Sequence, residues 1–171
     1  AAMKLKIGQS TIAIERGVRI HTHASENATE CDVVREKTGM DNVSYFHHLG
    51  LLGTHTTLAH CVWLTAEEQR LLRESGTRVA HCPSANFKLA SGTAKIPELL
   101  KQGIVVGLGA DGAPCNNNLD IFMELRLAAL IHLPRGGPTS LSAMTVLEMA
   151  TLNGAKALGL EGEIGCLQEG A

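Results

Sequence analysis

The sequence of 171 residues is poor in aromatic side chains, which make up only 3% of it. Leucine, isoleucine, valine and alanine must therefore fill the core, as they do in parallel α/β proteins. No apolar run approaches the ~20 residues of a membrane-spanning helix, so we expect no membrane partner. The net charge is −2, and the lysines and arginines are scattered, which excludes a basic surface for nucleic acid.

Paired cysteine motifs and a signal peptide are also lacking. The cysteines are widely spaced and odd in number, which favours buried, reduced thiols over a disulfide framework or a structural zinc site. We therefore expect a cytoplasmic protein. The chain opens on Ala-Ala-Met, which indicates either a remnant of expression or the edge of a longer chain. The five residues are Cys31, Cys61, Cys82, Cys115 and Cys166.

Four short apolar runs rich in β-branched residues are bounded by turn residues and predict buried strands. Helical patterns separate them, and this alternation predicts a parallel sheet with right-handed crossovers. The fold class is therefore α/β, either half of a (β/α)₈ barrel or a small doubly wound sheet. No G-x-G-x-x-G opens a helix, which argues against dinucleotide binding. The runs are 17-GVRIHTH-23, 55-HTTLAHCVWL-64, 77-TRVAHCP-83 and 103-GIVVGLGAD-111.

The helical segments carry recognisable start and stop signals. Thr65-x-x-Glu68 has the spacing of a capping box, and Gly76 is expected to stop the helix that follows. Pro134 is expected to end the longest helix. The predicted helices cover residues 28–38, 42–49, 65–76, 94–103, 118–133, 141–152 and 154–159.

Each predicted strand carries an ionisable residue at or near its C-terminal end, where active sites of parallel α/β proteins are built. These residues are His23 with Glu26, then His60, His81 and Asp111. A single histidine in an apolar strand is more often a hydrogen-bonded core residue. Four successive strands that each end in an ionisable residue are harder to explain by packing alone. Burying an unpaired aspartate also costs several kcal/mol.

A shared metal ion would account for this pattern. Imidazoles and a carboxylate suit one divalent cation, either Zn²⁺ or Fe²⁺. Such an ion lowers the pKa of bound water towards ~7, so that a nearby carboxylate can take its proton. A second carboxylic acid can protonate the leaving group. Asp111 and Glu26 are the acids placed for these two tasks.

The motifs together resemble the C-terminal half of the barrel of an amidohydrolase-superfamily enzyme. The branch is that of S-adenosylhomocysteine and guanine deaminases, with the triazine chlorohydrolases as relatives. The motifs occur in family order and cover nearly the whole chain from about residue 17. They are 21-HTHASEN-27, 58-LAHCVWL-64, 80-AHCPSANFKLASG-92, 108-LGADGAPCNNNLDIFMELRLA-128, 147-LEMATLNGAKALGL-160 and 163-EIGCLQEGA-171.

The resemblance implies a role for each strand-end residue. The four apolar runs would correspond to barrel strands five to eight. His23 is then a metal ligand, and Asp111 is both a metal ligand and the general base. Glu26 shuttles protons to the substrate, while His60 orients the hydrolytic water. Residues 80–89 line the substrate cavity, where the candidate contacts are His81 and Asn86.

The resemblance also implies a substrate, a metal and a domain division. The substrate is a purine-like or other N-heterocyclic small molecule, and Zn²⁺ is preferred over Fe²⁺ as the metal. Residues 1–160 form a partial barrel, and residues 161–171 begin a small β-sandwich. Hydrolysis of a carbon–nitrogen bond is favoured, and chloride is the alternative leaving group.

One departure from the family pattern is important. The family's first strand carries its own H-x-H, and nothing upstream of residue 17 resembles it. His21 is an alternative ligand, because it shares a face with His23. We therefore expect a fragment of a longer enzyme, or a half barrel that pairs with an N-terminal half or with a second copy. The remaining hypotheses are an inactive fragment and a non-enzymatic α/β module with structural histidines.

Overall fold

The computed structural model describes residues 12–169, which contain a four-stranded parallel sheet in the order β1-β2-β3-β4. The strands occupy the four predicted runs, and their neighbours along the chain are also their neighbours in the sheet. This confirms the predicted parallel α/β organisation. The strands are β1 (Ile20–Ala24), β2 (Thr56–His60), β3 (Arg78–His81) and β4 (Val106–Leu108).

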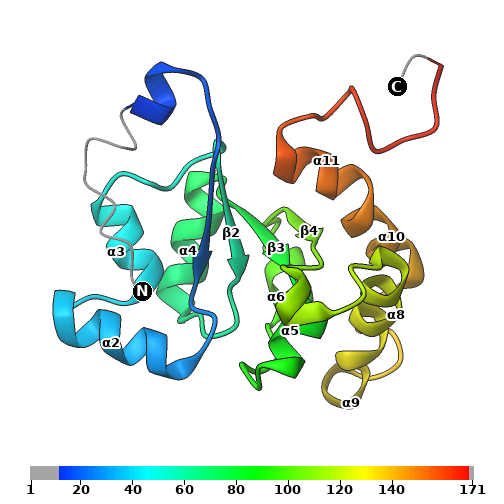
Figure 1. Ribbon diagram of the computed structural model, residues 1–171, viewed down its shortest axis with the longest axis horizontal. Coiled ribbons are helices and arrows are strands. Elements are labelled where there is room, and N and C mark those ends of the chain that lie inside the picture. The colour runs from blue at the N-terminus through cyan, green and yellow to red at the C-terminus, as the bar shows by residue number, and fades with distance from the viewer. Residues whose placement is uncertain (1–11, 170–171) are drawn as a thin grey trace.

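Helices connect and follow the strands. In Figure 1 the helices that precede β3 in the chain lie beside β1 and β2, and the helices that follow β4 lie on the β4 side of the sheet. The helices before β4 are α2 (Ala28–Thr38), α3 (Asn42–His48), α4 (Ala66–Ser75), α5 (Pro83–Lys88) and α6 (Ile96–Lys101). Those after β4 are α7 (Ala113–Asn116), α8 (Ile121–Ile131), α9 (Leu133–Gly136), α10 (Ala143–Ala150) and α11 (Leu152–Leu158).

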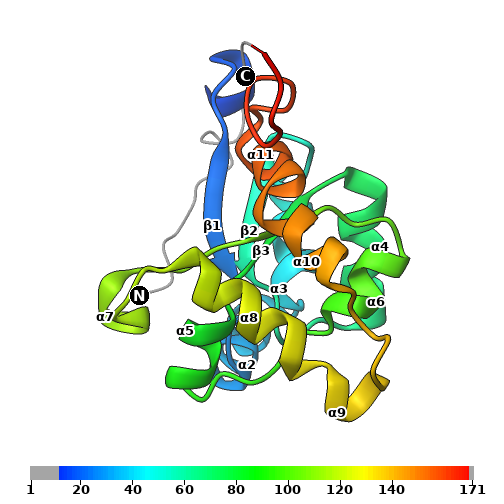
Figure 2. The ribbon, with the colours of Figure 1, turned by 90° about the vertical axis from the view of Figure 1, so that its right-hand side faces the viewer.

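The two faces of the sheet differ in the size of their side chains. Leu58, Val79 and Val106 are paired in register and fully buried in the core, on the face that packs against the helices. Figure 2 shows α4, α6 and α10 on one side of the strands. Burying each of these three side chains contributes about 1.5–3 kcal/mol. On the other face, the adjacent row places His23 beside three small residues, Ala59, Ala80 and Gly107.

The capping signals of α4 are confirmed. The Thr65 side chain accepts a hydrogen bond from the Glu68 backbone, the Glu68 side chain accepts one from the Thr65 backbone, and Gly76 adopts a left-handed φ of 69°. A cap of this kind is worth about 1 kcal/mol. The local sequence therefore determines where this helix begins and ends.

Two helix predictions need correction. Helix α8 ends at Ile131, before Pro134, and Pro134 lies in the first turn of the short helix α9. A proline is tolerated there because its missing N–H has no partner in the first turn of a helix. For the same reason Pro83 is tolerated as the first residue of α5 and Pro114 as the second residue of α7, and the sequence patterns predicted neither helix.

The tail after α11 has turns and a single bridge between Glu161 and Ile164. The expectation that residues 161–171 begin a β-sandwich stays a prediction. The Ala-Ala-Met start and residues 170–171 lie outside the described residues. Within residues 12–169, no helix combines the length and the apolar character needed to cross a membrane.

Candidate metal centre

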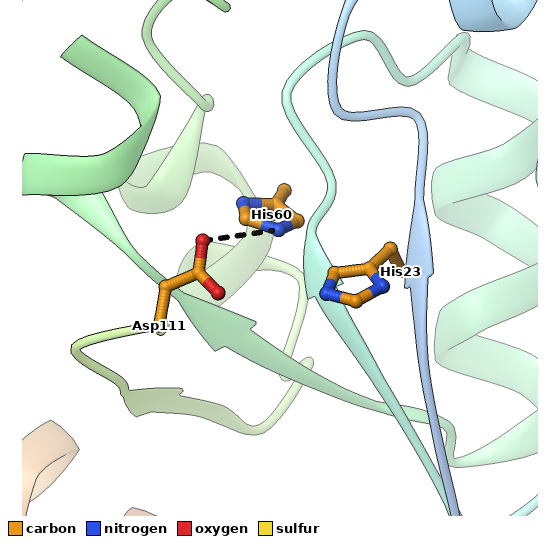
Figure 3. A group of neighbouring side chains, drawn as sticks. All are labelled: His23, His60 and Asp111. Carbon is orange, nitrogen blue, oxygen red and sulfur yellow. Dashed lines mark ion pairs between the residues drawn. The ribbon is translucent and has the colours of Figure 1, made fainter. Parts of the chain in front are cut away.

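Three side chains from different strands converge at the C-terminal end of the sheet. His23 lies on β1, His60 ends β2, and Asp111 follows β4. Each offers a ligand atom within 4.8 Å of the others. The His60 Nε2 atom is 4.0 Å from Asp111 Oδ2, and the His23 and His60 rings stack with centroids 5.2 Å apart. Figure 3 shows the three side chains directed towards a common space.

The backbone of His60 explains how its ring reaches His23. His23 pairs with Ala59 in the sheet, so strict alternation would direct His60 to the opposite face. His60 instead has a φ of 71°, which swings its Cβ away from the direction that it would have in a strand. Asp111 also adopts a left-handed conformation, with a φ of 62°. Such conformations cost of order 1–3 kcal/mol and persist only where neighbouring contacts hold them.

Hydrogen bonds between the turns hold these conformations. Ser25 follows β1 with a φ of 51°. Its carbonyl oxygen accepts hydrogen bonds from the backbone N–H groups of Val62 and Trp63, both at 3.0 Å. The N–H of Cys61 donates to the Ala24 carbonyl at 3.0 Å. The ends of β1 and β2 are thus bound to each other where His23 and His60 meet.

Asn86 determines which nitrogen of His60 faces the centre. The Nδ1 atom of His60 lies 2.8 Å from Asn86 Oδ1, and both side chains are buried. Because a carbonyl oxygen only accepts, Nδ1 carries a proton, and in the neutral ring the lone pair is therefore on Nε2. A hydrogen bond to the far nitrogen orients metal-binding histidines in the same way. Asn86 was predicted as a substrate contact, and the structure places it against His60.

Glu26 is held at the end of β1 by two contacts. Its backbone N–H donates to Glu30 Oε2 at 2.8 Å, and the Ser91 hydroxyl donates to Glu26 Oε1 at 3.4 Å. Glu30 donates its own backbone N–H to the N-cap Asn27. The spacing Asn27-x-x-Glu30 is a capping signal that the sequence analysis missed. No local pattern points to Ser91.

Two other histidines lie outside this cluster. His81 is fully buried with its ring centroid 5.9 Å from that of His132, and neither of its ring nitrogens has a partner within residues 12–169. Burial, with smaller contributions from His132 and His60, lowers the pKa of His81 to about 3. His21 is exposed and does not belong to the group of three. Partial removal of its ring from water, and then the nearby His23 and His60, lower the pKa of His21.

The side chains fit a divalent metal. Two imidazole nitrogens and one carboxylate oxygen are donors that suit Zn²⁺ or Fe²⁺. The lone pair of His60 Nε2 faces Asp111, and the His23 ring lies alongside. A tetrahedral site needs four ligands, so these residues leave room for ligands from outside the described chain or for water.

The chain is also similar to proteins of known activity. Residues 2–171 match the amidohydrolase family. The chain is 47% identical, over 154 residues, to the 5-methylthioadenosine/S-adenosylhomocysteine deaminase of Desulfitobacterium hafniense. The fold matches a zinc-bound adenosine deaminase from Xanthomonas campestris with a TM-score of 0.89 and 35% identity over 92% of this chain. It also matches the zinc complex of atrazine chlorohydrolase TrzN from Arthrobacter aurescens, with a TM-score of 0.87 and 33% identity over 94% of this chain.

The matches cover only part of each relative. This chain contributes 90% of its own length to the alignment with the Desulfitobacterium enzyme but spans 36% of that enzyme. It likewise covers 36% of the adenosine deaminase and of the chlorohydrolase structures. Together with the parallel sheet, this coverage confirms the prediction of a partial amidohydrolase barrel.

Proposed function

The chain belongs to the amidohydrolase family, and we propose that it forms the C-terminal catalytic half of a metal-dependent deaminase. The observation that carries this proposal is the convergence of His23, His60 and Asp111 from three strands. We propose an adenosine derivative or another purine-like N-heterocycle as substrate. The similarity to a deaminase of methylthioadenosine and S-adenosylhomocysteine supports this class.

In this proposal His23 and Asp111 hold one divalent ion. Zn²⁺ is preferred, because two similar structures contain zinc. When bound, the ion lowers the pKa of a coordinated water towards ~7. The Asp111 carboxylate would accept a proton from the hydrolytic water as the water oxygen adds to the ring carbon. His60 keeps the lone pair of Nε2 free, so it orients the water by accepting a hydrogen bond.

Glu26 would supply the proton that the leaving amine needs. Deamination adds oxygen to the ring carbon and breaks its bond to the amino nitrogen, and the amine must be protonated to leave as ammonia. Glu26 would carry a proton to the ring nitrogen and then to this amine. The Glu26 carboxylate is half-buried and accepts a hydrogen bond from the Ser91 hydroxyl. This bond restrains the direction of the Glu26 side chain.

A chlorohydrolase is the second candidate, supported by the likeness to the TrzN structure. Chloride leaves as an anion and needs no proton, so in this reaction Glu26 would protonate only the ring nitrogen. The protein at its full natural length should be assayed with adenosine derivatives and with a chlorinated triazine. Ammonia release supports the deaminase, whereas chloride release alone favours the second candidate.

The same preparation tests the two non-catalytic hypotheses. Metal analysis should find about one Zn²⁺ or Fe²⁺ per chain. If the full-length protein is active, and the 171-residue chain retains a metal but is inactive, the chain is an inactive fragment. A protein that retains none, and in which His23→Ala and Asp111→Ala change nothing, is an α/β module with structural histidines.

The remaining metal ligands require a source. Strands β1 and β4 end the sheet, so each has an outer edge unpaired within residues 12–169. Exposed strand edges pair with other chains or segments. We propose that an N-terminal half of the barrel covers these edges and completes the ligand set. Light scattering of the 171-residue chain alone tests the alternative, a homo-oligomer of half barrels, which would have a mass of at least two chains.

A further inference from the structure

Glu124 is a buried carboxylate outside the proposed catalytic machinery. It lies in α8 and is fully buried. A buried charge is unfavourable unless hydrogen bonds or opposite charges meet it. Two donors meet this one: the backbone N–H of Ser84 at 3.0 Å and the side-chain amide of Asn116 at 2.7 Å. Each donor is connected, through its own neighbours, to a different residue of the candidate metal centre.

The Asn116 contact leads to Asp111. The Asn116 amide also donates to the Ala110 carbonyl at 2.7 Å, directly before Asp111 in the chain. The loop has left-handed φ values at Asp111, Asn117 and Leu119. The backbone N–H of Leu119 donates to Asn116 Oδ1 at 3.3 Å. Asn116 is therefore the centre of the strained loop that carries Asp111, and Glu124 anchors Asn116.

The Ser84 contact leads to His60. Ser84 lies in the first turn of α5, and Asn86 follows two residues later in the same helix. The Oδ1 atom of Asn86 accepts a hydrogen bond from Nδ1–H of His60. A shift of α5 would therefore move the group that orients the His60 ring. One carboxylate thus holds both the loop of Asp111 and the helix that orients His60.

We propose that Glu124 is a positioning residue that sets the distance and direction of Asp111 relative to His60. The proposal rests on the proposed function, because it assumes that these two residues work together at a metal. Glu124 touches neither metal nor substrate in this scheme. Its effect passes entirely through Asn116 and through α5.

Glu68 offers a matched control. It is 1% exposed and lies on α4. Its carboxylate accepts hydrogen bonds from the backbone N–H groups of Val43 at 2.7 Å and Thr65 at 2.8 Å. It joins α3 to α4, as Glu124 joins α8 to α5 and α7, but none of its bonds reaches His60 or Asp111. Replacing this carboxylate therefore measures the loss of folding stability alone, without an effect on the positions of His60 and Asp111.

The experiment compares Glu124→Gln with Glu68→Gln in the protein at its full natural length. Cobalt(II) titration, followed by visible absorption, measures metal affinity, and thermal unfolding measures stability. The glutamine amide keeps one acceptor but directs an N–H towards the other donor, so both variants should unfold at lower temperature. Glu124→Gln should weaken cobalt binding 10–100-fold, the range for groups that orient metal ligands. Glu68→Gln should leave the affinity within about twofold. Unchanged affinity in Glu124→Gln, or an equal loss in both variants, would overturn the proposal.

A second variant and a second measurement cover the other outcomes. Asn116→Ala removes the bonds of Asn116 to Glu124 and to the Asp111 loop but keeps the bond between Ser84 and Glu124, and it replaces Glu124→Gln if that variant does not fold. It should weaken cobalt binding without changing the His60 tautomer, measured by ¹⁵N chemical shifts of the ring. Glu124→Gln should populate both tautomers. If the wild-type protein binds no cobalt, the proposed function fails. The tautomer of His60 then decides the positioning role, and an unchanged tautomer in Glu124→Gln refutes it.

Discussion

The Ser91 hydroxyl donates a hydrogen bond to the Glu26 carboxylate across 3.4 Å, although 65 positions separate the two residues in the chain. The Trp63 indole N–H donates to the Ser91 carbonyl at 2.7 Å and fixes the segment that brings Ser91 there. Glu26 therefore projects from the end of β1 with its direction restrained by the segment that follows α5.

Glu26→Gln should abolish deamination and leave the metal in place. The amide cannot carry a proton, and general acid–base catalysis typically contributes 10²–10⁴-fold, so we expect a loss of at least about 100-fold in kcat. Steady-state kinetics and metal analysis of the same preparation measure both effects. Ser91→Ala removes only the restraint and should cost less than Glu26→Gln. Loss of metal in Glu26→Gln would show that Glu26 is a ligand instead of a proton shuttle.

Asp111→Ala and His23→Ala should lower metal content strongly, because each removes a donor from the group of three. His21→Ala is the matched control. His21 lies two residues before His23 on β1, shares its face of the sheet and stands outside the group. Metal content measured by plasma mass spectrometry should fall well below one equivalent in the first two variants and stay near wild type in the third. An equal loss in His21→Ala would make it a ligand.

His81 should make the protein sensitive to acid. The unfolded chain binds a proton at His81 below about pH 6.5, whereas the folded protein, with the His81 pKa lowered to about 3, does not. Stability from this residue is therefore complete above pH 6.5 and is lost as the pH falls towards 3. The slope is about 1.4 kcal/mol per pH unit for one proton.

His81→Leu should reduce that slope by one proton. The ring nitrogens of His81 have no partner within residues 12–169, so leucine forfeits no hydrogen bond and should cost little at neutral pH. Urea unfolding at several pH values between 7.5 and 4.5 measures the difference. Parallel curves for the two proteins would mean that His81 is protonated in the folded state.

The cysteines should differ sharply in reactivity. Burial raises the pKa of the Cys61 thiol, and burial with the nearby Asp111 and Glu124 carboxylates raises that of Cys82 to about 12. Only the thiolate is nucleophilic, so neither residue should be alkylated by iodoacetamide at pH 8 in the folded protein. Cys166 is exposed and should be labelled. Peptide mass spectrometry, with urea-unfolded protein as the control, distinguishes the sites.

The predictable part of the fold follows from local rules. The β-branched runs predicted the strands, and the Thr65 and Gly76 signals predicted the limits of α4, because strand and helix periodicity and caps act over a few residues. The short helices α5 and α7 were missed, since a proline that begins a helix looks like a breaker in sequence. The end of α8 was misplaced for the same reason.

The sequence by itself determined the order of the strands and the presence of His23, Glu26, His60 and Asp111 near their C-terminal ends. It also determined the family, through the order of the motifs. Only the tertiary structure decided that His60 turns towards His23 through a φ of 71°. The tertiary structure alone placed the Glu124 carboxylate against Ser84, in the helix that orients His60, and against Asn116, which holds the loop of Asp111. Periodicity describes neighbours along an element, whereas backbone angles at strand ends and contacts between distant segments are set by packing of the whole domain.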